Sequence, residues 1–379
     1  MILKNSIYLD NSHATKPSGM AVAKMLPYYS EKWGIPSQPH EAGQELMAPL
    51  KNAYETLYTK LKADPEDLII FCNSGTEAVN QVLFSVYTDR TLNTGRNHFM
   101  VGKSDEAPAI MSAGRLEKLG CVATLVKVDP KSIIDAITPR TVMLSLSLGN
   151  GLTGTIAPIE EIAPVLKERA ILLHLDIGHV FGKMELDLNS LHADFITLDG
   201  SLIHGPRSSA IIWVKKGIKL DPFIMGGLDQ GGHRGAPVDV ALIAGLAEAA
   251  KESIEAIDYV ATETARLRKK LEKGMEKIGG KILFKDKPRL PHITAVVFPH
   301  IPNEALLFRL NKDNLYASMG GGNLQQIGFV LNALDIPENE SQSALSFSLS
   351  RETAEEDIDR AILLIERNIK ELEKVTRNI

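Results

Sequence analysis

The chain has 379 residues, of which 44% are hydrophobic and 23% charged, and its formal net charge is −5. This length allows one large and one smaller hydrophobic core, so two domains are expected. The balanced charge excludes a strongly basic, nucleic-acid-binding surface. No apolar stretch has the length of a membrane span, and Met1 to Pro17 lacks the apolar run of a signal peptide. We expect neither a nucleic acid nor a membrane as a partner.

The two cysteines, Cys72 and Cys121, lie in apolar segments that are predicted to be strands. Two cysteines cannot build a disulfide framework, and a zinc site of the cysteine type is not expected. Cys72 precedes a glycine turn, but it follows three apolar residues, and burial under a sheet is the preferred interpretation over a role as a nucleophile. The expected location is the reducing cytoplasm.

Short β-branched runs alternate with longer amphipathic stretches from about Ala14 to Leu220. This alternation predicts a mostly parallel sheet with helices on both of its faces. The predicted strands are Leu68–Phe71, Val122–Val126, Val142–Ser147, Ile171–Leu175, Phe195–Leu198 and Ala210–Val214, and the predicted helices include Pro108–Leu119 and Ile159–Arg169.

A long helical pattern, rich in Ala, Glu, Leu and Lys, runs from Val238 to about Ile278. The shorter alternation that follows predicts a smaller α+β domain, packed with an N-terminal strand at Ile7–Asp10. We expect a large α/β domain over residues 15–250, and a small domain built from residues 1–14 and 251–379. The elements predicted for the small domain are strands at Lys281–Phe284, His292–Val297 and Leu345–Leu349, a helix at Glu304–Leu310 and a final helix from about Ala354.

A glycine turn, Ser74-Gly75-Thr76, follows the first predicted strand of the large domain. A turn of this kind between a strand and a helix points backbone N–H groups and the positive helix end at an anion. The hydroxyl of Thr76 offers one more donor. An ordinary helix cap explains the same residues, so the turn by itself leaves both interpretations open.

Four segments, in this order and at these separations, resemble the cysteine desulfurases of the class V aminotransferase group. They are Tyr8-Leu9-Asp10-Asn11 with Ala14-Thr15, the segment from Gly34 to Gly43, the segment from Ser74 to Asn80, and the segment from Gly154 to Ile159. The resemblance implies fold type I, with a large α/β domain around a mostly parallel sheet and a smaller α+β C-terminal domain. It also implies pyridoxal phosphate as cofactor, with Gly75 and Thr76 at its phosphate.

Three more residues fall where this family contacts its cofactor. Asp176, in His174-Leu175-Asp176, resembles the aspartate of the family's H-x-D, which pairs with the pyridine nitrogen. Asn150 falls near the cofactor hydroxyl, although asparagine between glycines is equally typical of a turn. His179 replaces a glutamine. Any pyridoxal phosphate held here is expected to be non-covalent, and its predicted contacts are Gly75, Thr76, Asn150, Asp176 and His179.

The residues that carry the family's chemistry are replaced in this chain. Where the family has S-x-H-K before Gly-Pro, the sequence places Leu202 at the position of the lysine that forms the Schiff base, and leucine has no nucleophile. The stacking histidine becomes Ala107, the phosphate-binding threonine becomes Pro237 and the substrate-binding arginine becomes Ser346. The loop expected to present the persulfide cysteine holds none, and it includes Met319, Gly320, Gly321 and Gly322.

These losses predict a degenerate site with no catalytic residue and no metal. The preferred hypothesis is a desulfurase-like scaffold or regulatory partner in sulfur transfer or iron–sulfur cluster assembly. It would form a homodimer, or a heterodimer with a paralogue, and engage a sulfur acceptor or an iron–sulfur scaffold protein. Two alternatives stay open: an enzyme that holds pyridoxal phosphate non-covalently for altered chemistry, and a repurposed metal or ligand pocket near His174, Asp176, His179 and His204.

Overall fold

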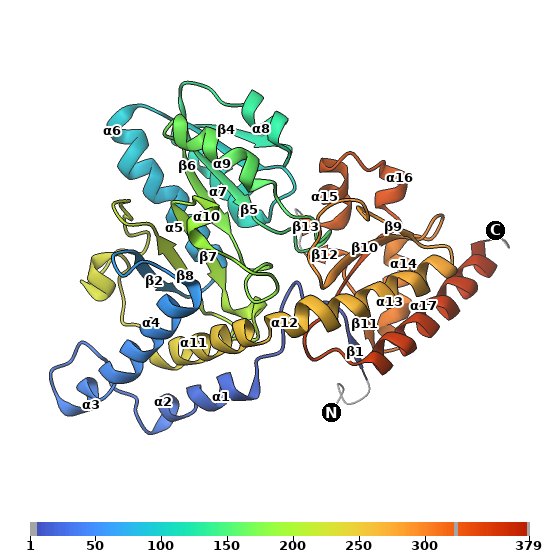
Figure 1. Cartoon of the computed structure of the whole chain (residues 1–379), viewed down its shortest axis with the longest axis horizontal. Coiled ribbons are helices and arrows are strands. Elements are labelled where there is room, and N and C mark those ends of the chain that lie inside the picture. Colours follow the sequence, from blue (N-terminus) through green and yellow to red (C-terminus); the bar gives the residue numbers. More distant parts are fainter. Residues whose placement is uncertain (1–5, 322–324, 377–379) are drawn as a thin grey trace. The chain divides into compact units, whose positions relative to one another are not determined.

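The computed structural model describes residues 6–321 and 325–376, and they build two units, each with its own sheet core (Figure 1). Unit 1 comprises Met1–Thr15, Gly149–Ile156 and Ala256–Ile379. Unit 2 comprises Lys16–Leu148 and Ala157–Glu255. The sequence-based boundaries differ from these chiefly in leaving residues 149–156 with the large domain.

Unit 2 contains a seven-stranded sheet with the order β2-β8-β7-β6-β5-β3-β4. Strand β8 is antiparallel to both of its neighbours, and all other pairs are parallel, which confirms the predicted mostly parallel sheet. The strands are β2 Leu68–Cys72, β3 His98–Gly102, β4 Val122–Val126, β5 Thr141–Ser147, β6 Leu172–Asp176, β7 Phe195–Asp199 and β8 Ala210–Val214.

Helices cover this sheet, and α5 packs against α7 as well as against strands β7 and β8. Helix α11 packs against both α1 and α4 (Figure 1). The helices of unit 2 are α1 Gly19–Met25, α2 Pro27–Ser30, α3 Glu41–Gln44, α4 Met47–Leu61, α5 Gly75–Val86, α6 Leu92–Thr94, α7 Ala107–Glu117, α8 Pro130–Asp135, α9 Ile159–Glu168, α10 Leu188–Leu191 and α11 Val240–Glu255.

Unit 1 is built on an antiparallel sheet with the order β14-β10-β9. Strand β1 pairs with β11 in parallel, so the N-terminal strand belongs with the C-terminal elements as predicted. The strands are β1 Ile7–Tyr8, β9 Lys281–Ile282, β10 Ile293–Val297, β11 Leu315–Tyr316, β12 Gly320–Gly321, β13 Gln325–Gln326 and β14 Ala344–Ser348. The helices are α12 Ile257–Tyr259, α13 Ala265–Lys277, α14 Asn303–Lys312, α15 Ile327–Ala333, α16 Glu338–Ser341 and α17 Glu355–Thr376.

The predicted helix from Val238 to Ile278 is interrupted. Helix α11 ends at Glu255, Ala256 has ψ of 0°, and a π-helical turn at Val260–Thr264 precedes α13. The break coincides with the boundary between the two units. Among the helices of the described ranges, none combines the length and the apolar character that a membrane crossing needs.

Candidate functional site

The candidate site of unit 2 lies where the parallel strands end, the edge at which open α/β sheets place their ligands. Ser147 and Asp176, the last residues of β5 and β6, are neighbours in register, and Asp176 is in register with Thr197 in the middle of β7. Asp176 accepts a hydrogen bond from the Thr197 hydroxyl at Oδ2 (2.7 Å) and from the Gly178 amide at Oδ1 (2.9 Å). Burial, and then the negative charge of Glu106, raises the pKa of Asp176 to about 6.

His174 lies two residues before Asp176 on β6 and is 1% exposed. The Thr197 hydroxyl donates its hydrogen to Asp176, so it accepts one from His174 Nε2 (3.0 Å). The Ser145 hydroxyl then donates to Nδ1 (2.8 Å). The ring is therefore the neutral Nε2–H tautomer, and burial lowers the pKa of His174 to about 3. Both nitrogens are engaged within the sheet, which leaves no lone pair for a metal.

His179 follows β6 in the next turn and is 4% exposed. Its Nε2 pairs with Oε1 of the half-exposed Glu106 at 2.6 Å. The neighbouring Asp105 is buried and accepts a hydrogen bond from the Ser147 amide (3.0 Å). Burial, together with the charges of Glu106 and Asp176, raises the pKa of Asp105 well above its usual value. The site is thus acidic: Glu106 interacts with Asp105 and Asp176, and both Glu106 and Asp176 interact with the His179 ring.

The predicted anion turn at the start of α5 contains an anion that belongs to the chain itself. Asp199, at the end of β7, accepts a hydrogen bond from the Gly75 amide at Oδ2 (2.7 Å). Its Oδ1 accepts hydrogen bonds from Ser201, from both the amide (2.8 Å) and the hydroxyl (2.6 Å). Sequence analysis did not select Asp199, although an acidic residue at the first position of the S-x-H-K segment was a visible signal.

Leu202 follows this aspartate in a 3₁₀ turn, Gly200–Leu202. A Cβ added to Gly178 would lie 2.7 Å from Leu202 Cδ1 and 3.2 Å from Asp176 Oδ1, so the leucine side chain reaches the surroundings of that carboxyl group. A lysine is present nearby, because Lys183 Nζ donates to the carbonyl oxygens of Leu202 (2.7 Å) and Gly178 (3.3 Å). That ammonium group holds the backbone of the turn.

Asn150 belongs to unit 1, where it organises a turn. Its Oδ1 accepts hydrogen bonds from the amides of Leu152 (3.0 Å) and Thr153 (2.9 Å) and from the Thr153 hydroxyl (3.0 Å). These contacts are those of the turn interpretation that the sequence left open.

The loop assigned to the persulfide cysteine also lies in unit 1. Met319 precedes the short β12, and its carbonyl accepts a hydrogen bond from the Ile327 amide (2.8 Å). Gly320 and Gly321 form β12 itself, while Gly322 lies outside the described residues. Ser346, which takes the position of the family's substrate-binding arginine, is fully buried and donates its hydroxyl hydrogen bond to the Leu152 carbonyl oxygen (2.7 Å).

The residues proposed for a metal have other contacts. His204 Nδ1 bonds to the Lys16 carbonyl oxygen (2.8 Å), and His174 and His179 are engaged as described above. Over residues 6–321 and 325–376, no group of three or more His, Cys, Asp or Glu side chains is arranged to hold a metal ion.

Cys72 and Cys121 are both buried, and burial raises the pKa of both thiols, which disfavours the reactive thiolate.

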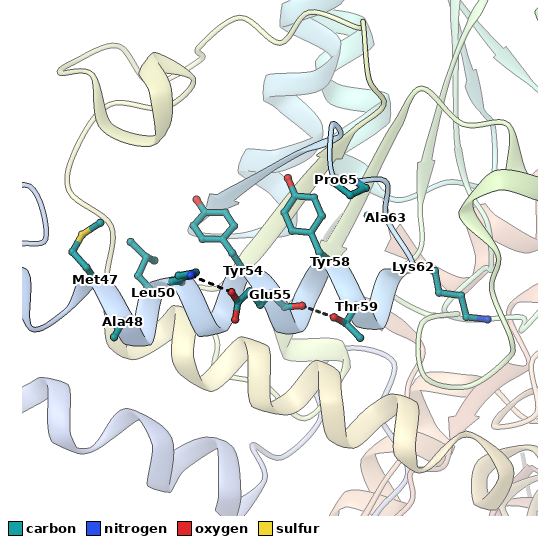
Figure 2. Close-up of a pocket in the computed structure, with 11 residues that line it drawn as sticks. Met47, Ala48, Leu50, Tyr54, Glu55, Tyr58, Thr59, Lys62, Ala63 and Pro65 are labelled. Carbon is teal, nitrogen blue, oxygen red and sulfur yellow. Dashed lines mark hydrogen bonds and ion pairs between the residues drawn. The ribbon is translucent and has the colours of Figure 1, made fainter.

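A groove of about 1010 Å³ runs along α4, away from the predicted site residues. Tyr54 and Tyr58 stand on the same side of this helix (Figure 2). Burial raises the pKa of Tyr54 to about 12, so its hydroxyl stays neutral. None of the five predicted cofactor contacts lines the groove. Its surface is mainly apolar, which suits a protein-binding surface better than a catalytic pocket. The lining residues are Met47, Ala48, Leu50, Lys51, Tyr54, Glu55, Tyr58, Thr59, Lys62, Ala63 and Pro65.

The chain matches known proteins along nearly its whole length. Residues 7–361 match the family described as aminotransferase class-V. A cysteine desulfurase of Gluconacetobacter diazotrophicus is 33% identical over 372 residues, covering 94% of this chain and 92% of that protein. The cysteine desulfurase NifS of Azotobacter vinelandii is 30% identical over 383 residues, covering 98% and 94%. A solved NifS-like protein superposes with a TM-score of 0.91 at 25% identity, covering 97% of this chain and 100% of that one.

These similarities identify a protein of the fold that the sequence resemblance implied, and the predicted fold class is confirmed. The chain belongs to the aminotransferase class-V family. Within that family it is similar to the cysteine desulfurases. A NifS-like protein from Rickettsia africae, at 21% identity and a TM-score of 0.86, shares the fold.

Membership of this family makes pyridoxal phosphate the cofactor to test against the residues of unit 2. Asp176 has the enclosed carboxyl group that suits a pyridine nitrogen. Gly75 and the position of the Schiff-base lysine do not fit. The Gly75 amide is already held by Asp199, whose charge opposes a phosphate, and Leu202 offers no amine. The residues present therefore do not fit pyridoxal phosphate bound in the manner that the resemblance implies.

Proposed function

We propose that this chain is a desulfurase-like protein without desulfurase activity, and that it serves as a scaffold or regulatory partner in sulfur transfer or iron–sulfur cluster assembly. The observation that carries the proposal is Leu202, which takes the lysine position of the motif and reaches the surroundings of Asp176. A leucine cannot form an imine, and without an imine the chemistry of the family has no starting point.

The retained fold supports a role in assembly, because a fold can persist after its catalytic site has changed. Unit 2 exposes large apolar side chains in two stretches, one from α1 to the start of α4 and one in the loop before α11. Apolar side chains gathered on a surface are typical of protein interfaces. The most exposed of them are Met20, Leu26, Tyr29, Trp33, Met47, Met225 and Leu228.

The first test is spectroscopic. We expect the purified protein to show no absorption band of a bound imine after incubation with pyridoxal phosphate, and borohydride to attach no pyridoxyl group to any lysine. We also expect no sulfide release from cysteine. Mass spectrometry of the reduced protein would identify any labelled residue. Stable labelling of Lys183, the lysine that contacts the Leu202 backbone, would contradict the proposal and restore an enzymatic interpretation.

The second test addresses assembly. We expect sedimentation to show a dimer. Trp33→Glu should weaken its association at least about tenfold, because it replaces an apolar side chain that is 76% exposed in the single chain with a charge that the interface would have to bury. Met111→Glu is the matched control, since Met111 is 58% exposed on α7, outside both apolar stretches. A monomer at all concentrations, even with a paralogue from the same source present, would contradict the proposed assembly.

A further inference from the structure

The N-terminal turn of α5 is held by side chains of the chain itself. Ser74 accepts a hydrogen bond from the Glu77 amide (3.1 Å), and the Glu77 carboxylate accepts one from the Asn73 amide (3.0 Å). Asp199, which lies 124 residues further along the chain, accepts the hydrogen bond of the Gly75 amide (2.7 Å). A helix N-terminus presents such amides to an anion, and here the anion is a carboxylate.

Asp199 is fixed in this position rather than resting against the helix by chance. Its second oxygen receives two hydrogen bonds from Ser201, one from the amide (2.8 Å) and one from the hydroxyl (2.6 Å). The carboxylate thus has three donors on two oxygens, and it also begins the 3₁₀ turn that contains Leu202. Rotating the carboxylate away would break all three hydrogen bonds together.

The approach of this carboxylate to the helix is close. A Cβ added to Gly75 would lie 3.0 Å from Asp199 Oδ2 and 3.1 Å from Asp199 Cβ. The space directly at the helix end is therefore filled by the aspartate side chain. A phosphate group would have to enter the same space and bring a second negative charge next to the first.

We propose that Asp199 is a built-in replacement for a bound phosphate, and that it is the residue by which this chain rejects phosphate and phosphorylated cofactors at α5. The inference deepens the proposed function, on which it rests. It explains how a chain with the strand–turn–helix of a phosphate site folds without a phosphate: the helix end is neutralised by a side chain that cannot dissociate.

The test measures binding of inorganic phosphate by calorimetry to four proteins: the wild type, Asp199→Ser, Asp199→Asn and Asp129→Ser. Asp129 caps α8 in a comparable way, through a hydrogen bond from the Ser132 amide (2.9 Å), so its substitution is the matched control. We expect Asp199→Ser to bind phosphate at least about tenfold more tightly than the wild type, because the like charge is gone. Asp129→Ser should behave as the wild type does.

Asp199→Asn keeps an acceptor for the Gly75 amide and removes only the charge, so it carries the test if Asp199→Ser does not fold. A gain in phosphate affinity in either variant, with a matching rise of the melting temperature in phosphate, supports the inference. Equal affinity of the wild type and the folded variants overturns it. Because inorganic phosphate has no aldehyde, this failure is distinguishable from failure of the proposed function, which would appear as an imine or as sulfide in the wild type.

Discussion

Replacing Glu272 by glutamine is expected to lower the free energy of unfolding by about 3–5 kcal/mol. Glu272 lies on α13 in unit 1 and is 4% exposed. Its Oε1 contacts Nη1 of Arg289 (3.0 Å) and Nη1 of Arg268 (3.4 Å), and both guanidinium groups are buried as well. Burial lowers the pKa of Arg268, because desolvation disfavours its charged form. Without the carboxylate, two buried positive charges would face each other with no counter-charge.

Within the described residues, Nε and Nη1 of Arg268 make no hydrogen bond, and Nη1 has only its ion pair with Glu272. The loss should be measured by urea unfolding followed by circular dichroism, since both tryptophans, Trp33 and Trp213, lie in unit 2 and do not report directly on unit 1. Glu276→Gln is the control: it lies one helical turn further along α13 and pairs with Lys285 at the surface. It should cost less than about 1 kcal/mol. Equal losses in the two variants would refute the buried-charge argument.

Six of the seven strands of the large sheet could be predicted from sequence, because each of them contains a short apolar run. Predicted and observed limits agree within a residue for strands such as Leu68–Cys72 and Thr141–Ser147. Strand His98–Gly102 was missed. Only three of its residues, Phe99 to Val101, form an apolar run, which is too short to show a period, and the strand is recognisable only from its pairing with β4 and β5.

The candidate site was less accessible to sequence analysis, because its decisive contacts join distant positions. Asp199 and Gly75 are 124 residues apart, and His179 and Glu106 are 73 residues apart. Motif comparison selects residues that occupy a family's positions, so it found Asp176 and Leu202. It did not show the role of Asp199: the acidic residue in the S-x-H-K segment was visible, but its contact forms only where the end of β7 meets the N-terminus of α5. The burial that raises the pKa of Asp176 is likewise a property of packing, not of spacing.

The buried His174 should lower the stability of the protein in acid, and a single substitution at this position should remove that loss. Its pKa falls from 6.5 in the unfolded chain to about 3 in the folded one, so below pH 6.5 the unfolded state binds a proton that the folded state refuses. The stability contributed by the neutral ring is fully present above pH 6.5. It declines by about 1.4 kcal/mol per pH unit as the pH falls from there towards 3.

His174→Gln removes this titration while preserving both hydrogen bonds, because the amide can donate to Thr197 and accept from Ser145. The wild type minus variant difference in free energy of unfolding should fall by about 2 kcal/mol between pH 6.5 and pH 5. Asp176 works in the opposite direction, since its raised pKa favours the folded state as the pH falls, but it is present in both proteins. Tryptophan fluorescence in urea suits the measurement, because Trp213 lies in the same sheet. A difference that does not change with pH would mean that His174 becomes protonated within the fold, and the hydrogen-bonded order Ser145–His174–Thr197–Asp176 would then be wrong.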